Sequence, residues 1–252
     1  MADAVVLEGL VKTFGGSLAV DHLSLRVPAG SMFGLVGPNG AGKTTTLSMA
    51  TGLLRPDHGT ATILGHDVWS DPAAAKAVMG IAPDGMRLFD TLSGGELLQF
   101  VGELRSMPRV LVRERSAELI QVLGLGKAEN VVVADYSAGM TKKIGLACAL
   151  LHAPRLLVLD EPFESVDPVS ADTILAILRR FVAGGGTVIM SSHSMEFVEV
   201  VCDRVAVVAA GRVRAAGTTA QVQGGMPLRQ RFLSLVGATG MPADGGLQWL
   251  QS

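Results

Sequence analysis

The sequence predicts an α/β fold with a mostly parallel β-sheet, a smaller antiparallel β portion and an inserted all-helical segment. Three observations predict it. Short β-rich runs alternate with helical patterns, the N-terminal part carries strand-like runs joined by tight turns, and the middle of the chain has helical periodicity alone. With 252 residues, of which 48% are hydrophobic and 17% charged, the chain can bury a large core.

The antiparallel portion is predicted at the N-terminus. Its strands are expected at Val5 to Leu10, at Leu18 to Val27 and at Thr60 to Leu64, the last after a turn at Asp57-His58-Gly59. The first parallel strand is expected at Phe33 to Val36, and a helix-compatible run from Thr45 to Leu53 follows it. The chain thus passes from the antiparallel portion into the α/β core.

The helical segment is expected from about Thr91 to Leu151, where Leu97, Leu98, Val101 and Leu104 have the spacing of one buried helix face. Core strands resume at Leu156 to Asp160 and at Thr187 to Met190. After Gly217 the signals fade. We therefore expect one domain over residues 1–222, with a helical part of about 85–152 inserted in it, and a C-terminal tail over 223–252.

Composition excludes several classes of protein. Lys and Arg number 21 against 23 Asp and Glu, for a net charge of −2, so no general basic field favours a nucleic-acid partner. Cys148 and Cys202 lack metal-binding spacing and form no disulfide framework, which favours a reducing compartment. No basic segment typical of a signal peptide begins the chain, and its apolar runs are shorter than the roughly 20 residues of a membrane span. We expect a soluble, cytoplasmic protein.

Residues 37–44 satisfy the phosphate-loop pattern GxxxxGK[ST] between an expected strand and an expected helix. Glycines let backbone N–H groups curve around a phosphate, and the helix N-terminus adds partial positive charge. Lys43 would reach the β- and γ-phosphates, and the hydroxyl of Thr44 would bind Mg²⁺. The nucleotide-binding residues expected here are Gly37, Pro38, Asn39, Gly40, Ala41, Gly42, Lys43, Thr44 and Thr45.

Two further strand ends carry polar side chains. The apolar run from Leu156 ends in Asp160 and Glu161, and His193 follows the next strand. Ligands bind at the carboxyl edge of a parallel sheet, so these residues are expected near the phosphate loop. Asp160 would hold Mg²⁺, Glu161 would polarise the attacking water, and His193 would lie near the γ-phosphate. Without the loop, the acidic pair would more often be a strand end facing water, and a single histidine would more often be structural or merely exposed.

Together these motifs resemble the nucleotide-binding subunit of the ATP-binding cassette (ABC) family, whose core is a P-loop NTPase fold. Gly37 to Thr44 corresponds to the Walker A motif, Leu156 to Glu161 to Walker B, and His193 to the switch histidine. The family signature is similar to Tyr136-Ser137-Ala138-Gly139-Met140, and the D-loop to Glu164-Ser165-Val166-Asp167. The resemblance implies ATP hydrolysis with Mg²⁺ and an ABC ATPase domain over residues 1–222.

The resemblance also implies partners. Two cassettes would pair head to tail, most simply as a homodimer, and Ser137, the N–H of Gly139 and Asp167 would then contact ATP bound to the other copy. A separate membrane permease would dock beside Asp84, near Leu88 and Phe89, and hold the chain on the inner face of the cell membrane. Three segments resemble bacterial multidrug-type exporters, namely the signature, Phe232 to Val236 and the ending Trp249-Leu250. This resemblance favours export over import.

Some positions depart from the family pattern. Asp84 stands where glutamine is usual, so it can ligate Mg²⁺ but cannot donate a hydrogen bond. Ala138 and Met140 replace a glycine and a glutamine of the signature. A second segment, Leu92-Ser93-Gly94-Gly95-Glu96, is closer to the usual signature. No strand that ends in acidic residues follows it within a few tens of positions. We therefore interpret Ser93 and Glu96 as a capping box at the start of a helix.

The resemblance places the family's adenine-stacking aromatic residue at Phe14, whose ring offers a face for stacking. The alternative is that Phe14 fills the core of the small antiparallel sheet. At the level of the whole chain two alternatives stay open. One is a non-transport ABC ATPase acting on ribosomes or DNA, and the other is a nucleotide-binding regulator that hydrolyses ATP weakly.

Overall fold

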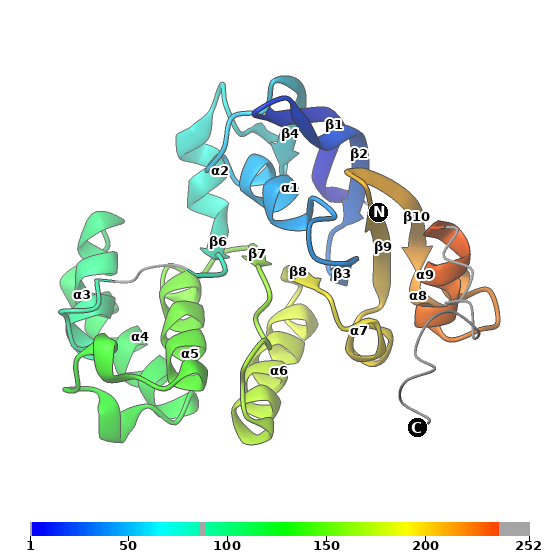
Figure 1. Cartoon of the computed structure of the whole chain (residues 1–252). Coiled ribbons are helices and arrows are strands. Elements are labelled where there is room, and N and C mark those ends of the chain that lie inside the picture. Colours follow the sequence, from blue (N-terminus) through cyan, green and yellow to red (C-terminus); the bar gives the residue numbers. More distant parts are fainter. Residues whose placement is uncertain (1, 86–88, 237–252) are drawn as a thin grey trace, which may run out of the picture.

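The computed structural model describes residues 2–85 and 89–236, which form two β-sheets and a group of helices beside them (Figure 1). The described strands are β1 (Asp3–Phe14), β2 (Ser17–Pro28), β3 (Met32–Val36), β4 (His58–Ile63), β5 (His66–Asp67), β6 (Met79–Ala82), β7 (Leu156–Leu159), β8 (Thr187–Ser192), β9 (Arg204–Ala209) and β10 (Arg212–Thr218). The described α-helices are α1 (Lys43–Ala50), α2 (Pro72–Val78), α3 (Gly94–Leu104), α4 (Arg109–Val122), α5 (Ala138–Leu150), α6 (Pro168–Ala183), α7 (Met195–Val201), α8 (Thr219–Gln223) and α9 (Leu228–Val236).

The larger sheet has the strand order β10-β9-β3-β8-β7-β6, and every pair except β9 with β10 is parallel. Strands β3, β7 and β8 are buried along their whole length, as expected where helices cover both faces of a parallel sheet. Since β3, β8 and β7 are neighbours, the segments that follow them meet at one edge of the sheet. The predicted α/β class with a mostly parallel sheet is confirmed.

The smaller sheet is antiparallel, with the order β2-β1-β4-β5. Helix α1 lies between this sheet and the parallel sheet (Figure 1), and one hydrophobic cluster joins all three. Leu10 of β1, Leu35 of β3 and Met49 of α1 are fully buried in it. Helix α1, which the phosphate loop precedes, is therefore packed between the two sheets.

Helices α3, α4 and α5 form the predicted helical part, which is set to one side of the sheets (Figure 1). Helix α3 begins with the predicted capping box: the Ser93 hydroxyl accepts from the Glu96 N–H, and the Glu96 carboxylate accepts from the Ser93 N–H at 2.8 Å. Leu97 and Leu98 are buried, as expected.

The prediction that Leu104 belongs to the buried face of α3 is wrong, because 67% of this residue is exposed. Gly94 and Gly102 are both buried, and Gly102 lies directly against Val112 of α4. Leu104 lies seven residues after the buried Leu97, on nearly the same side of the helix, but it is the last residue of α3. Hydrophobic periodicity indicates which side of a helix is buried, but it does not indicate where along the helix the packing ends.

Strand β6 and the C-terminal helices were missed by the sequence reading. Helix α5 packs against β6 so closely that a Cβ on Gly80 would collide with the carbonyl oxygen of Ala149. Within the expected tail, α9 begins with the buried Leu228, whose N–H donates to Glu199 of α7 at 2.8 Å. Leu88 and Trp249-Leu250 lie outside the described residues.

Candidate nucleotide-binding site

The phosphate loop joins β3 to α1, and backbone crowding explains its glycines. Gly40 and Gly42 have φ of 76° and 98°, in the left-handed region that disfavours side chains. A Cβ on Gly42 would lie 2.6 Å from the carbonyl oxygen of Ala19, and one on Gly37 would collide with the carbonyl oxygen of Val208. Pro38, Asn39, Gly40 and Thr44 are exposed, and Ala41 is buried. The loop can therefore present its backbone to a phosphate.

Lys43 is the first residue of α1 and only 6% exposed. Its ammonium donates to the carbonyl oxygens of Gly37, at 2.8 Å, and Pro38, at 3.2 Å. It also lies 3.6 Å from Oε1 of Glu161. The cation thus lies against the loop, with the acidic end of β7 beside it.

Asp160 and Glu161 follow β7 and are both buried. The Asp160 carboxylate accepts a hydrogen bond from the Ser191 hydroxyl of β8, and the same hydroxyl accepts from the Glu161 N–H at 2.9 Å. The Glu161 side chain has Lys43 on one side and His193 on the other, with Oε2 at 3.1 Å from His193 Nδ1. The structure therefore brings together Lys43, Glu161 and His193, three residues that the sequence places on separate segments.

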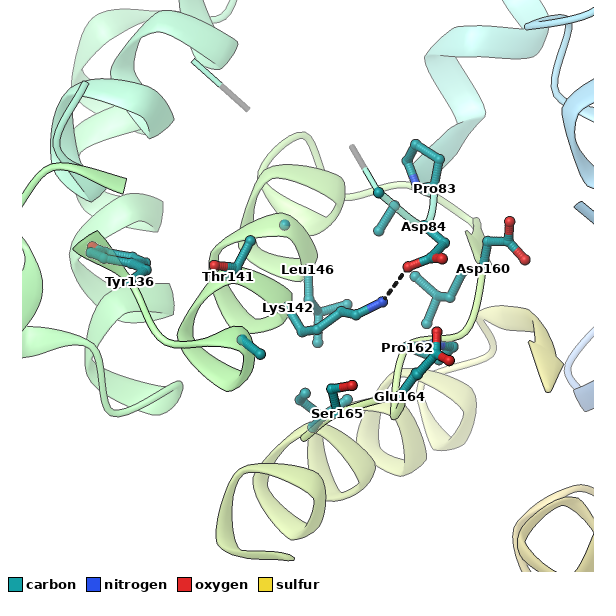
Figure 2. Close-up of a pocket in the computed structure, with 16 residues that line it drawn as sticks. Pro83, Asp84, Tyr136, Thr141, Lys142, Leu146, Asp160, Pro162, Glu164 and Ser165 are labelled. Atoms are coloured by element: carbon teal, nitrogen blue, oxygen red, sulfur yellow. Dashed lines mark hydrogen bonds and ion pairs between the residues drawn. The ribbon is translucent and has the colours of Figure 1, made fainter. Parts of the chain in front are cut away.

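Asp84 lies in the loop after β6 and faces a cavity of about 340 Å³ between that loop, α5 and the residues after β7. Figure 2 shows Lys142 of α5 reaching across to it, with Nζ 2.9 Å from Asp84 Oδ1. The same ammonium donates to the carbonyl oxygen of Glu161 at 2.8 Å. Asp160 also lines this cavity. Asp84 is therefore held by a cation in this state of the chain.

Ser137, Gly139 and Asp167 gather at the N-termini of α5 and α6. Ser137 caps α5 through the Met140 N–H, and Asp167 caps α6 through the Ser170 N–H at 3.0 Å. Hydrogen bonding from the side chain and the backbone N–H of Ser170 holds the pKa of the Asp167 carboxyl below its usual value. A Cβ on Gly139 would lie 3.0 Å from Asp167 Oδ2. Among the described residues, no hydrogen bond or ion pair links these three to the phosphate loop.

Phe14 ends β1 at the turn into β2, and 49% of it is exposed. The alternative that Phe14 fills the small sheet is therefore wrong. The Lys12 ammonium lies 5.7 Å from the centre of its ring, which adds a cation to the exposed aromatic face.

The three expected Mg²⁺ ligands, Thr44, Asp84 and Asp160, offer the hard oxygen atoms that Mg²⁺ prefers. The Asp160 carboxylate accepts a hydrogen bond from the Ser191 hydroxyl, which also accepts one from the Glu161 N–H. Thr44 lies in the exposed first turn of α1. These two residues fit the metal, whereas Asp84 would have to leave Lys142. Residues 2–85 and 89–236 contain no group of three or more His, Cys, Asp and Glu side chains suited to a metal ion.

Two residues of the site were missed by sequence reasoning, Ser191 and Lys142. Ser191 is part of the run that precedes His193, and its hydroxyl gave no local signal of a contact with the neighbouring strand. Lys142 is one of two adjacent lysines early in α5, which is ordinary for a helix surface.

In the part of the chain that the structure covers, no helix is long and apolar enough to span a membrane.

Comparison with known proteins shows the family of the chain. The model of the ABC transporter family matches residues 20–164, more than half of the chain. The daunorubicin/doxorubicin resistance ATP-binding protein DrrA of Streptomyces peucetius is 40% identical over 87% of this chain and 67% of its own length. The linearmycin resistance ATP-binding protein LnrL of Bacillus subtilis is 37% identical over 84% of this chain and 68% of its own.

Solved structures give the same fold. The structure of an ATP-binding subunit of an ABC transporter superimposes with a TM-score of 0.85 and 26% identity, over 92% of this chain and 99% of that one. A nucleotide-free ATP-binding cassette, 24% identical, superimposes with a TM-score of 0.77 over 92% of this chain and 96% of its own. With the phosphate loop, the acidic strand end and His193 converging at one sheet edge, this chain belongs to the ABC transporter family, as an ATP-binding and ATP-hydrolysing subunit.

Proposed function

We propose that this subunit binds MgATP at residues 37–45 and hydrolyses it with Glu161 as the general base, to power export through a separate membrane permease. The observation that carries the proposal is the position of Glu161, with its carboxylate between Lys43 of the phosphate loop and His193. A carboxylate beside a phosphate-binding cation can accept a proton from a water aimed at the γ-phosphorus.

Lys43 and the loop backbone would bind the nucleotide. In the free chain the Lys43 ammonium is satisfied by two neutral carbonyl groups, and phosphate oxygens are stronger acceptors for it. The N-terminus of α1 adds partial positive charge at the same point. Phe14, exposed at the turn after β1, would stack on the adenine.

Thr44 and Asp160 would hold Mg²⁺, whose charge neutralises oxygens of the β- and γ-phosphates when it is bound. Asp84 would join them if its ion pair with Lys142 opens. His193, hydrogen-bonded to Glu161, would orient that carboxylate and lie near the γ-phosphate. In this arrangement Glu161 takes the proton and Lys43 meets the developing charge.

Within the family, such subunits dimerise. We propose a head-to-tail homodimer in which Ser137, Gly139 and Asp167 complete the site of the other copy. The exposed position of Ser137 at the N-terminus of α5 supports this, because backbone N–H groups at a helix start bind anions. Hydrolysis would then separate the two copies.

We propose that the permease docks beside Asp84 and Phe89 and holds the chain at the cytoplasmic face of the membrane. Phe89 is 55% exposed, and its ring packs edge-on against Phe100 of α3 with 4.7 Å between ring centres. The drug-resistance relatives in Streptomyces peucetius and Bacillus subtilis support export as the direction. The membrane protein that co-purifies with the native chain tests this assignment.

The test of the catalytic role is Glu161→Gln, with Glu118→Gln on the exposed face of α4 as control. Glu161→Gln removes the proton acceptor but keeps the side-chain volume, so ATP hydrolysis should fall by about 100-fold or more while ATP still binds. An ATP-bound dimer should then accumulate and elute earlier from size exclusion. Equal hydrolysis rates for native protein and Glu161→Gln would remove Glu161 from the mechanism.

A further inference from the structure

Lys142 joins three parts of the molecule. It projects from α5, in the helical part, and its ammonium donates to Asp84 Oδ1 at 2.9 Å (Figure 2). The same ammonium donates to the carbonyl oxygen of Glu161 at 2.8 Å. The first acceptor follows β6 and the second follows β7. One side chain therefore ties α5 to both loops, including the one that carries the proposed base.

The backbone of Glu161 depends on such support. Its φ of 45° lies in the left-handed region, which crowds the Cβ of any residue except glycine. Its N–H donates to the Ser191 hydroxyl, and its carbonyl oxygen accepts from Lys142 and, at 3.2 Å, from the Glu164 N–H. Both peptide groups of Glu161 are thus held, and the bond from the Lys142 ammonium is the only charge-assisted one of these three.

Asp84 keeps Lys142 in this position. A lysine side chain has four flexible carbons, so a fixed ammonium needs a partner that holds it. Packing alone does not provide one, because Lys142 borders a cavity of about 340 Å³ that is also lined by Leu146, Pro162 and Ile174. The Asp84 carboxylate supplies the missing constraint.

We propose that Lys142 is a positioning residue for ATP hydrolysis, oriented by Asp84, that holds the main chain of Glu161 so that its carboxylate faces the γ-phosphate. The inference rests on the proposed role of Glu161 as the base. It assigns Asp84 a role through Lys142, which is distinct from the contact with Mg²⁺ that Asp84 could make only with this ion pair open.

The first experiment compares steady-state ATP hydrolysis in Lys142→Met, Lys142→Arg and the control Lys127→Met, an exposed lysine of the same helical part. Lys142→Met should lower kcat by about 10-fold, because a small displacement of a catalytic group is costly, and should change KM by less than about twofold. Lys142→Arg should recover most of the rate, since the guanidinium keeps the charge and the donors. Lys127→Met should match the native protein.

The second experiment tests the coupling to Asp84 by a double-mutant cycle. Asp84→Asn should lower kcat by less than Lys142→Met does, and the double variant should match Lys142→Met, because Asp84 acts through Lys142. Additive losses would show that Asp84 acts independently and would overturn its assigned role.

The third measurement needs no nucleotide. Hydrogen exchange in the free protein should be faster around residues 161–164 in Lys142→Met than in Lys127→Met, because the Glu161 carbonyl loses its strongest partner. Unchanged exchange, a native kcat in Lys142→Met, or a loss confined to KM would each overturn the proposal. If Glu161→Gln abolishes hydrolysis while Lys142→Met is native-like, only the positioning role fails. If Glu161→Gln hydrolyses ATP at the native rate, the proposed function itself fails.

Discussion

Lys43 gives the sharpest test of the phosphate loop. In the free chain its ammonium is satisfied by the carbonyl oxygens of Gly37 and Pro38 and lies 3.6 Å from Glu161. Binding ATP exchanges the neutral carbonyl acceptors for anionic phosphate oxygens. Hydrogen bonds to charged groups contribute about 1.5–3 kcal/mol each, so the net loss on removing the ammonium is about 3 kcal/mol. That corresponds to roughly 100-fold weaker binding of MgATP.

Two substitutions separate charge from packing. Lys43→Ala removes both the ammonium and the buried methylene groups, and it leaves the Glu161 carboxylate with His193 as its remaining partner in the site. It should destabilise the free protein by about 1–3 kcal/mol as well. Lys43→Met keeps most of the buried volume, so its unfolding temperature should fall less, while its affinity for ATP should fall equally.

The assay is titration calorimetry with MgATP on protein whose folding is checked by thermal denaturation. Lys76→Ala, at an exposed position of α2, is the control and should bind ATP like the native chain. An affinity of folded Lys43→Met within about threefold of the native value would refute the assignment of residues 37–44, because the cation would then make no contact with the nucleotide.

Two further predictions concern adenine and pH. Phe14→Ala should weaken ATP binding by about 10-fold, since base stacking is worth about 1–3 kcal/mol, and leave tripolyphosphate binding unchanged, which a pair of competition titrations can check. Burial, with a smaller effect of Arg105, lowers the pKa of His152 to about 4, against 6.5 for an ordinary histidine. As pH falls, His152 therefore takes up its proton in the unfolded chain before it does so in the folded chain. The free energy of unfolding, measured with urea, should consequently fall as pH drops from 6.5 towards 4. The same free energy should change less with pH in His152→Gln.

The motifs that are continuous in the sequence were predictable, because each carries its own local physics. The phosphate loop needs glycines at φ above zero and a helix start, and both constraints are visible in residues 37–44. The capping box at Ser93 and Glu96 is equally local, since the two bonds span three residues. The strand ends at Glu161 and His193 could be placed at one sheet edge because parallel strands share their direction.

Features that depend on a neighbour from elsewhere in the chain could not be predicted. Helix α4 can approach α3 closely because Gly102 has no side chain where Val112 lies, and strand β6 can approach α5 because Gly80 has none beneath the carbonyl of Ala149. A glycine gives no apolar signal, so periodicity passes over it. The hydroxyl of Ser191 is a similar case, because its two partners, Asp160 and Glu161, follow the neighbouring strand β7 and are distant in the sequence.

Asp84 shows how such a neighbour changes the interpretation of a motif. From the sequence, aspartate in place of glutamine adds negative charge near a triphosphate and removes a donor, which suggests a weakened site. In the structure the Lys142 ammonium balances that charge and supplies a donor to the carbonyl of Glu161. The two positions therefore act as one unit, and Asp84→Gln alone would leave the Lys142 charge without its carboxylate. Restoring the family residue at position 84 should consequently lower hydrolysis in this chain, unless position 142 is changed with it.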